Sequence, residues 1–174
     1  MLSILLPIDF SENATNAITY ALEFFKYQNT KFYVIHAYQN EFYDHDELLS
    51  REVFEDILDN VRNGSQTDLE NLLKKVNTIA QNPRFTYHII LANNTLDEEA
   101  NLIADSKNID LIVIGTKGKS DERHIVFGSQ TFQVQKYVQC PVLAIPSNYT
   151  KTQPKHMLFP STIDKVSLRL AIPI

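Results

Sequence analysis

A series of glycines in the second half of the sequence has the spacing needed to hold a phosphate group. The series is Gly115-x2-Gly118-x9-Gly128-Ser129. Glycines let a backbone approach a ligand closely, and a helix that starts after Gly128 offers unpaired N–H groups and a partial positive charge. The Ser129 hydroxyl and the ammonium group of Lys117 or Lys119 add further groups for an anion. The alternative is an ordinary turn followed by a helix cap.

A single carboxylate near the amino terminus suits a different part of a nucleotide. Asp9 directly follows the apolar run 2–8, and a carboxylate at such a strand end can accept hydrogen bonds from ribose hydroxyls. The alternative role for Asp9 is an N-terminal cap of the next helix. Neither the P-loop nor the Gly-x-Gly-x-x-Gly fingerprint is present, so the glycine series must be interpreted on its own spacing.

The elements that must position these residues alternate between short apolar runs and amphipathic stretches. Strands are expected at 2–8, 31–38, 84–92, 111–114 and 141–145, and helices at about 14–25, 47–80, 95–104 and 129–138. This alternation predicts an α/β fold, an open five-stranded parallel sheet with helices on both faces. Ligands of such sheets bind beyond the carboxyl ends of the strands, where strand order reverses, so Asp9 and Gly115 are the strand ends of interest.

Hydroxyl residues mark the expected helix starts. Ser11 and Ser129 are candidate N-caps, and Thr95 with Glu98 forms a candidate capping box. Within 47–80 the residues Asn63-Gly64-Ser65 interrupt the helical pattern, which leaves open whether one long helix or two short ones form. In the last helix Phe132, Val134, Tyr137 and Val138 are expected to supply its apolar positions.

The composition is that of an ordinary globular protein with a small negative charge. The chain has 174 residues and a formal net charge of −5, which leaves no basic field to hold nucleic acid. The apolar run 2–8 has no preceding Lys or Arg and stops at Asp9, so neither a signal peptide nor a membrane span is predicted and a cytoplasmic protein is expected. The single Cys140 excludes an internal disulfide and is interpreted as a small hydrophobe.

Metal and hydrolytic chemistry have no clear signal in the sequence. The histidines His36, His45, His88, His124 and His156 show no paired metal spacing. The acidic run Asp44-His45-Asp46-Glu47 is interpreted as a solvated loop, and no Gly-x-Ser-x-Gly motif is present. A metal site made only of protein ligands and a catalytic triad are therefore not predicted.

Four segments taken together resemble the universal stress protein family. They are the glycine series, Leu6-Pro7-Ile8-Asp9-Phe10-Ser11, Val34-Ile35-His36-Ala37 and Cys140-Pro141-Val142-Leu143. The resemblance covers about residues 1–147, and the four segments in this order are specific although each alone is weak. It implies a five-stranded α/β fold, a homodimer formed through the last strand and, in one branch of the family, a bound ATP.

The same resemblance implies which residues hold the nucleotide. Asp9 would meet ribose or adenine, Ala37 would line the adenine pocket, and the glycine series with Gln130 would hold ribose and phosphates, which would bring Mg²⁺ with them. The candidate binding residues are Pro7, Ile8, Asp9, Ala37, Ile114, Gly115, Thr116, Lys117, Gly118, Gly128, Ser129 and Gln130. Gln130 replaces a residue that is often small and apolar in the family, and Asp121-Glu122 add two carboxylates, so both are expected to weaken triphosphate binding.

The predicted function is that of a stress-response regulator that binds ATP and hydrolyses it slowly at most. The alternative is a nucleotide-free dimeric protein-interaction module of the same fold. An adenylate-forming enzyme ranks last, because the His-Ile-Gly-His and Ser-Gly-Gly-x-Asp signatures are absent. The stress that is sensed and the protein partners are not predicted, and no membrane or nucleic-acid partner is expected.

Residues 148–174 differ in character from the predicted domain 1–147. A polar linker leads to 155–162, which mirrors 3–9 with Thr162 where Asp9 lies. This segment resembles the incomplete start of a second domain of the same family. Its apolar pieces, Met157–Phe159 and Leu168–Ile172, are expected to pair with the body of the domain or with a second chain.

Overall fold

The computed structural model describes residues 1–38, 51–117, 128–147 and 149. Its elements are β1 (Leu2–Pro7), α1 (Glu12–Phe24), β2 (Thr30–Ala37), α2 (Arg51–Ile79), β3 (Phe85–Ala92), α3 (Leu96–Lys107), β4 (Leu111–Gly115), α4 (Ser129–Tyr137) and β5 (Val142–Ile145). The order of strands and helices agrees with the predicted alternation. The tail segments 155–162 and 168–172, the acidic run 44–47 and the pair Asp121-Glu122 lie outside the described residues.

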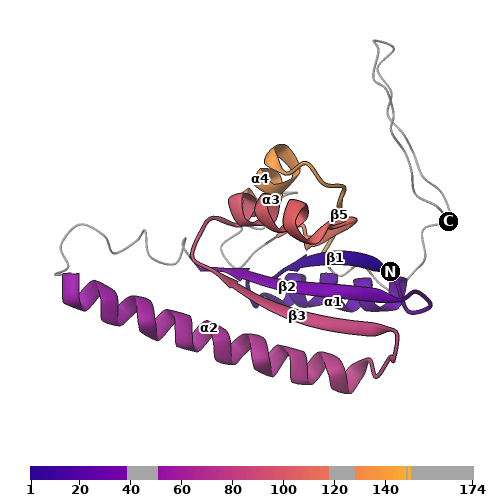
Figure 1. Cartoon of the computed structure of the whole chain (residues 1–174), viewed down its shortest axis with the longest axis horizontal. Helices are drawn as coiled ribbons and strands as arrows, with labels where there is room; N and C mark the ends of the chain where they lie inside the picture. Colours follow the sequence, from indigo (N-terminus) through magenta and orange to yellow (C-terminus); the bar gives the residue numbers. More distant parts are fainter. Residues whose placement is uncertain (39–50, 118–127, 148, 150–174) are drawn as a thin grey trace, which may run out of the picture.

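The strands form one parallel sheet in the order β3-β2-β1-β4-β5. The chain moves outward from β1 to β3 and then crosses back to β4, so strand order reverses between β1 and β4. Helices α1 and α2 cover one face of the sheet, and α3 and α4 cover the other (Figure 1). The predicted fold class is therefore confirmed.

The core consists of two apolar layers separated by the sheet. Ile4 and Leu6 of β1 pack with α1 and α2, whereas Leu5 between them packs with α3 and α4. Successive side chains of a strand point to opposite faces, and a strand covered on both sides must be apolar at every position. This explains the continuous apolar run at the start of the chain and the similar run Ile112–Ile114, whose side chains are buried.

The interruption at 63–65 does not break α2, which is one continuous helix. The Thr67 hydroxyl donates to the Asn63 carbonyl oxygen at 2.9 Å, a bond within the helix. Leu69 and Val76, two turns apart on one face, are buried against the sheet. Packing of this face outweighs the low helix propensity of Gly64.

The predicted helix caps are confirmed at α1, confirmed in position but not in bonding at α3, and wrong at α4. Ser11 is the N-cap of α1, and its Oγ accepts a hydrogen bond from the Ala14 amide at 3.1 Å. Thr95 occupies the N-cap position of α3, but its side chain makes no capping bond, so the capping box with Glu98 does not form. The N-cap of α4 is Gly128, and Ser129 is the first helical residue.

Helix α4 buries Val134 and Val138, as predicted, but not Phe132 and Tyr137. Phe132 and Tyr137 are 57% and 52% exposed. The buried residues are Thr131, Val134 and Val138, whose spacing places them on one side of the helix. A hydrogen bond from the buried Thr131 hydroxyl to the Gly115 carbonyl oxygen, 2.7 Å long, sets this rotation.

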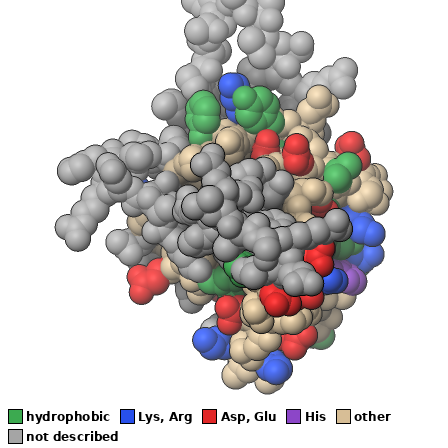
Figure 2. All heavy atoms as spheres, turned by 90° about the vertical axis from the view of Figure 1, so that its left-hand side faces the viewer, with side chains coloured by type: hydrophobic (Ala, Val, Ile, Leu, Met, Phe, Trp, Pro, Cys, Tyr) green, Lys and Arg blue, Asp and Glu red, His purple; other side chains and the backbone are tan. Residues whose placement is uncertain are grey.

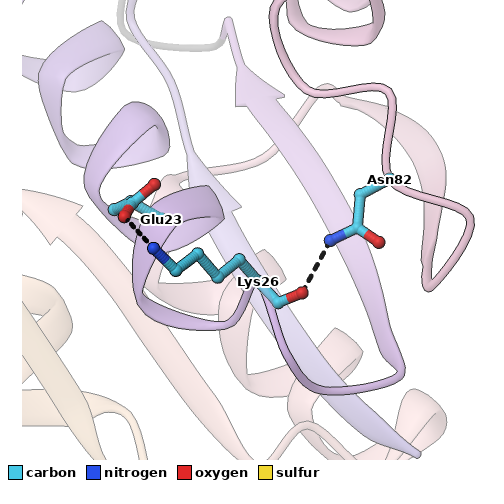
Figure 3. Close-up of polar contacts among 3 residues, drawn as sticks. All are labelled: Glu23, Lys26 and Asn82. Carbon is cyan, nitrogen blue, oxygen red and sulfur yellow. Dashed lines mark hydrogen bonds and ion pairs between the residues drawn. The ribbon is translucent and has the colours of Figure 1, made fainter.

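A short polar network joins two turns at the amino edge of the sheet. The Asn82 Nδ2 atom, between α2 and β3, donates to the Lys26 carbonyl oxygen between α1 and β2 at 2.8 Å (Figure 3). The Lys26 ammonium also forms an ion pair with Glu23 in the preceding turn of helix. The bond from Asn82 to Lys26 joins the neighbouring entries into β2 and β3.

Tyr87 on β3 carries a buried hydroxyl that has no hydrogen-bond partner within the part of the chain that the structure describes. Its ring stacks on Phe32 with centroids 5.7 Å apart. Burial raises the pKa of Tyr87 to about 12. We expect Tyr87→Phe to raise the free energy of unfolding by about 1 kcal/mol in urea titrations, because it removes an unsatisfied polar group and keeps the ring.

The pH dependence of this variant provides a second test. The folded-state pKa of Tyr87, about 12, lies above its unfolded value of about 10, so the folded protein favours the protonated hydroxyl. The stability that depends on this protonated form is complete below pH 10 and is lost as the pH rises towards about 12. Tyr87→Phe lacks this loss, so its advantage over the parent protein should grow above pH 10. Tyr137→Phe, at an exposed tyrosine, is the control, and equal responses of the two variants would contradict the prediction.

Candidate functional site

The candidate binding residues that the structure describes gather at the carboxyl edge of three neighbouring strands. They are Pro7, Ile8 and Asp9 at the end of β1, Ala37 at the end of β2, Ile114, Gly115, Thr116 and Lys117 at the end of β4, and Gly128, Ser129 and Gln130 at the start of α4. We call this set the carboxyl-edge site. Gly118 and Lys119 lie outside the described residues.

The pairing between β1 and β4 stops before either strand ends. In the register of these two strands, Ile4 pairs with Leu111 and Leu5 pairs with Ile112. Strand β1 continues to Pro7 and strand β4 to Gly115. The last residues of both strands therefore lie beyond their mutual pairing, at the point where strand order reverses. This is the position at which open parallel sheets bind ligands.

The carboxyl edge faces the viewer in Figure 2. The carboxyl ends of β2 and β3 lie on the left of Figure 1, which is the side turned forward in Figure 2. Described acidic and basic side chains both lie around this face. The described side chains around this face are thus mixed in charge.

The turn from β1 into α1 is shaped by three consecutive residues. Asp9 Oδ1 accepts a hydrogen bond from the Ser11 amide at 3.0 Å, and Phe10 between them has φ of 61°. A bulky residue in this left-handed region costs roughly 1–3 kcal/mol and is held there by its surroundings. Asp9 is therefore not the N-cap of α1, because Ser11 has that role. Its carboxylate instead braces the turn at the strand end.

His36 supports this turn from the neighbouring strand. The ring is buried, and its Nδ1 atom lies 2.8 Å from the Ile8 carbonyl oxygen. Because a carbonyl oxygen only accepts, the Nδ1 atom that faces it must carry the proton. The Phe10 ring lies against the imidazole with centroids 4.7 Å apart. The sequence contained no signal for this role beyond the position of His36 in an otherwise apolar strand.

The junction between β4 and α4 is closed by short hydrogen bonds. The Gly128 amide donates to the Thr116 carbonyl oxygen at 2.6 Å, and the Thr131 hydroxyl donates to the Gly115 carbonyl oxygen. The start of α4 therefore lies directly against the end of β4. The first-turn amides of an α-helix have no acceptor within the helix, and those of Ser129 and Gln130 belong to an exposed and a half-buried residue, respectively.

Helix α1 also contacts this junction, through Asn13, a residue that belongs to none of the motifs in the sequence. Asn13 Nδ2 donates to the Lys117 carbonyl oxygen at 2.8 Å. A Cβ atom added at Gly115 would lie 2.8 Å from Asn13 Nδ2 and 2.9 Å from the Asn13 carbonyl oxygen. Gly115 is thus needed for the close approach of α1, a role distinct from its predicted contact with a ligand.

Metal ligation and thiol chemistry have little support among the described residues. Within ranges 1–38, 51–117 and 128–147, no group of three His, Cys, Asp or Glu residues could hold a metal ion. Burial, with a smaller effect of Asp110, raises the pKa of Cys140 to about 11. A thiol with this pKa is almost fully protonated near neutral pH, so Cys140 is a poor nucleophile.

No described helix is long and apolar enough to cross a membrane.

Comparison with known proteins agrees with this architecture. Residues 1–146 match the universal stress protein family. Universal stress protein MJ0577 of Methanocaldococcus jannaschii is 24% identical over 155 residues, which span 82% of this chain and 93% of that protein. A solved structure of MJ0577 superposes with a TM-score of 0.70 at 26% identity and covers 85% of this chain and 97% of that one.

Two further solved structures share the fold and contain nucleotides. A universal stress protein in complex with cAMP has a TM-score of 0.55 at 16% identity, covering 83% of this chain and 96% of that one. A family protein from Arabidopsis thaliana with AMP bound has a TM-score of 0.54 at 14% identity, covering 85% and 93%. At these identities the likeness is one of fold alone.

Proposed function

Because the chain belongs to the universal stress protein family, we propose that its carboxyl-edge site binds an adenine nucleotide, ATP with Mg²⁺, and that the protein is a stress-response regulator. The observation that carries the proposal is the early parting of β1 and β4. Asp9 follows β1, and the junction with α4 follows β4. These two strands are neighbours, and strand order reverses between them.

Each part of the site suits one part of the nucleotide. The Asp9 carboxylate can accept from ribose hydroxyls, and Ala37, half-buried at the end of β2, offers a small apolar surface to the base. The amides of Ser129 and Gln130, the Ser129 hydroxyl and the backbone beyond Gly115 would hold the phosphates. Three or four charge-assisted hydrogen bonds, each worth roughly 1.5–3 kcal/mol, are enough for micromolar affinity after the cost of association.

The nucleotide complexes of related structures support the class of ligand. The fold accommodates cAMP in one relative and AMP in another, so adenine nucleotides are compatible with this architecture. The Mg²⁺ in the proposal would be held mainly by phosphates and water, as this ion prefers. Slow hydrolysis at most is proposed, because the sequence contains no Gly-x-Ser-x-Gly motif and no triad pattern.

We further propose a homodimer, a cytoplasmic location and a segment from residue 148 that belongs to a second domain of the same family. The edge strand β5 has one unpaired side within the described sheet and could meet a second copy. A nucleotide-free interaction module is the second candidate function. It is favoured by Leu102, Phe132 and Tyr137, exposed apolar side chains of α3 and α4.

Calorimetric titration with ATP and Mg²⁺ tests the proposal directly. We expect saturable binding with a dissociation constant in the micromolar range, about 1–100 μM. Native mass spectrometry of protein purified without added nucleotide should reveal any nucleotide that is carried along. A sample with neither heat of binding at about 100 μM protein nor a copurified nucleotide would favour the interaction module.

A further inference from the structure

The two polar atoms of the Asn13 side chain, in the first turn of α1, have different surroundings. Its Nδ2 atom donates to the Lys117 carbonyl oxygen, 104 residues away in the sequence. Its Oδ1 atom is buried and accepts no hydrogen bond from any residue that the structure describes. One end of the carboxamide therefore makes a long-range bond, and the other end is left unsatisfied.

This arrangement is a poor choice for stability alone. A buried acceptor without a partner costs free energy comparable to what the single hydrogen bond contributes. A smaller side chain would remove both the bond and the unsatisfied oxygen, with little net change in stability. The distinctive effect of Asn13 is geometric, because its amide fixes where the main chain of Lys117 lies.

The main chain that Asn13 contacts adjoins the proposed phosphate site. Lys117 follows Thr116, whose carbonyl oxygen accepts the Gly128 amide at the start of α4. Gly115, on the other side of Thr116, packs against the Asn13 main chain. Asn13 thus contacts both neighbours of Thr116, the residue whose carbonyl oxygen holds the start of α4 against β4.

We propose that Asn13 is a positioning residue for the phosphate-binding junction of β4 and α4. Its amide holds the Lys117 carbonyl so that the nearby backbone amides present one arrangement to the phosphates of a nucleotide. The ligand in this proposal rests on the proposed function, whereas the positioning of the junction does not. Asn13 is expected to matter for the phosphates of ATP and not for the adenosine moiety.

The test compares Asn13→Ala with Asn16→Ala in the full chain. Asn16 lies one turn further along α1, and its Nδ2 atom donates to the Pro146 carbonyl oxygen at 3.4 Å, at the end of β5. For Asn13→Ala we expect ATP affinity to fall about tenfold, adenosine affinity to stay within about twofold, and the melting temperature to change by less than about 4 °C. Asn16→Ala should leave both affinities unchanged.

Hydrogen exchange of the Gly128 amide gives a readout that needs no nucleotide. We expect exchange in the unliganded Asn13→Ala protein to be at least about fivefold faster than in the parent or in Asn16→Ala, because the acceptor Thr116 is less well held. If the parent protein binds neither ATP nor adenosine, the proposed function fails while this measurement still decides the role of Asn13. Unchanged exchange at Gly128 overturns the inference.

A second variant covers the case in which alanine at position 13 prevents folding. Asn13→Ser keeps a small polar side chain that is too short to span the distance to the Lys117 carbonyl. It should reproduce the faster Gly128 exchange and the selective loss of ATP affinity. A serine variant in which ATP and adenosine weaken equally would show that Asn13 has only a general structural role.

Discussion

Gly115→Ala is expected to lower the free energy of unfolding by roughly 1–3 kcal/mol. The added methyl group would lie 2.8 Å from Asn13 Nδ2, 2.9 Å from the Asn13 carbonyl oxygen and 3.1 Å from its carbonyl carbon. Two of these atoms belong to the backbone of α1, so they cannot move aside by a change of rotamer. Relief requires the first turn of α1 to shift away from β4, which weakens the packing of the Ala14 and Ala17 side chains in the core.

Gly64→Ala is the matched control for this variant, and its effect should have the opposite sign. No atom lies within 4 Å of a Cβ added at Gly64, which is inside α2. Alanine is favoured over glycine in a helix interior by about 0.5–1 kcal/mol. No described glycine has positive φ, so backbone strain does not obscure the comparison. Urea denaturation of both variants provides the test, and equal or stabilising effects of the two would contradict the proposed packing role of Gly115.

The sequence predicted the fold well because the fold depends on local patterns. A continuous apolar run such as Ile112–Ile114 predicts a buried strand from its own residues, and a serine such as Ser11 caps the helix that follows it directly. The alternation of strands and helices then restricts the topology, because parallel strands require right-handed crossovers. The sheet edge that carries Asp9 and Gly115 could therefore be predicted before any contact between them was known.

The contacts that shape the site could not be predicted in this way. Asn13 bonds to Lys117 and His36 faces Ile8 across strands, and no periodic pattern relates residues so far apart. The exposure of Phe132 and Tyr137 on α4 could not be predicted either, because the bond from the Thr131 hydroxyl to Gly115 joins two elements that no local pattern relates. Polar tertiary bonds of this kind decide details that hydrophobic periodicity leaves open.

Asp9→Asn should reduce the affinity for ATP by about 10- to 100-fold with little change in stability. Asparagine keeps a side-chain oxygen, so the 3.0 Å hydrogen bond from the Ser11 amide and the turn around Phe10 can persist. What is lost is the negative charge that would strengthen hydrogen bonds from the two ribose hydroxyls. Titration of ATP with Mg²⁺ into the variant, with urea denaturation in parallel, separates a loss of binding from a loss of fold.

The choice of nucleotide and control makes this last test specific. Asp105→Asn, an exposed carboxylate near the end of α3 at the opposite edge of the sheet, should leave ATP affinity unchanged. If Asp9 contacts the ribose, Asp9→Asn should discriminate less between ATP and 2′,3′-dideoxy-ATP than the parent protein does, because that analogue lacks both hydroxyls. A variant that still distinguished the two nucleotides as strongly as the parent would place the ribose elsewhere. The carboxylate would then serve only to brace the turn through Ser11, as the 3.0 Å bond already permits.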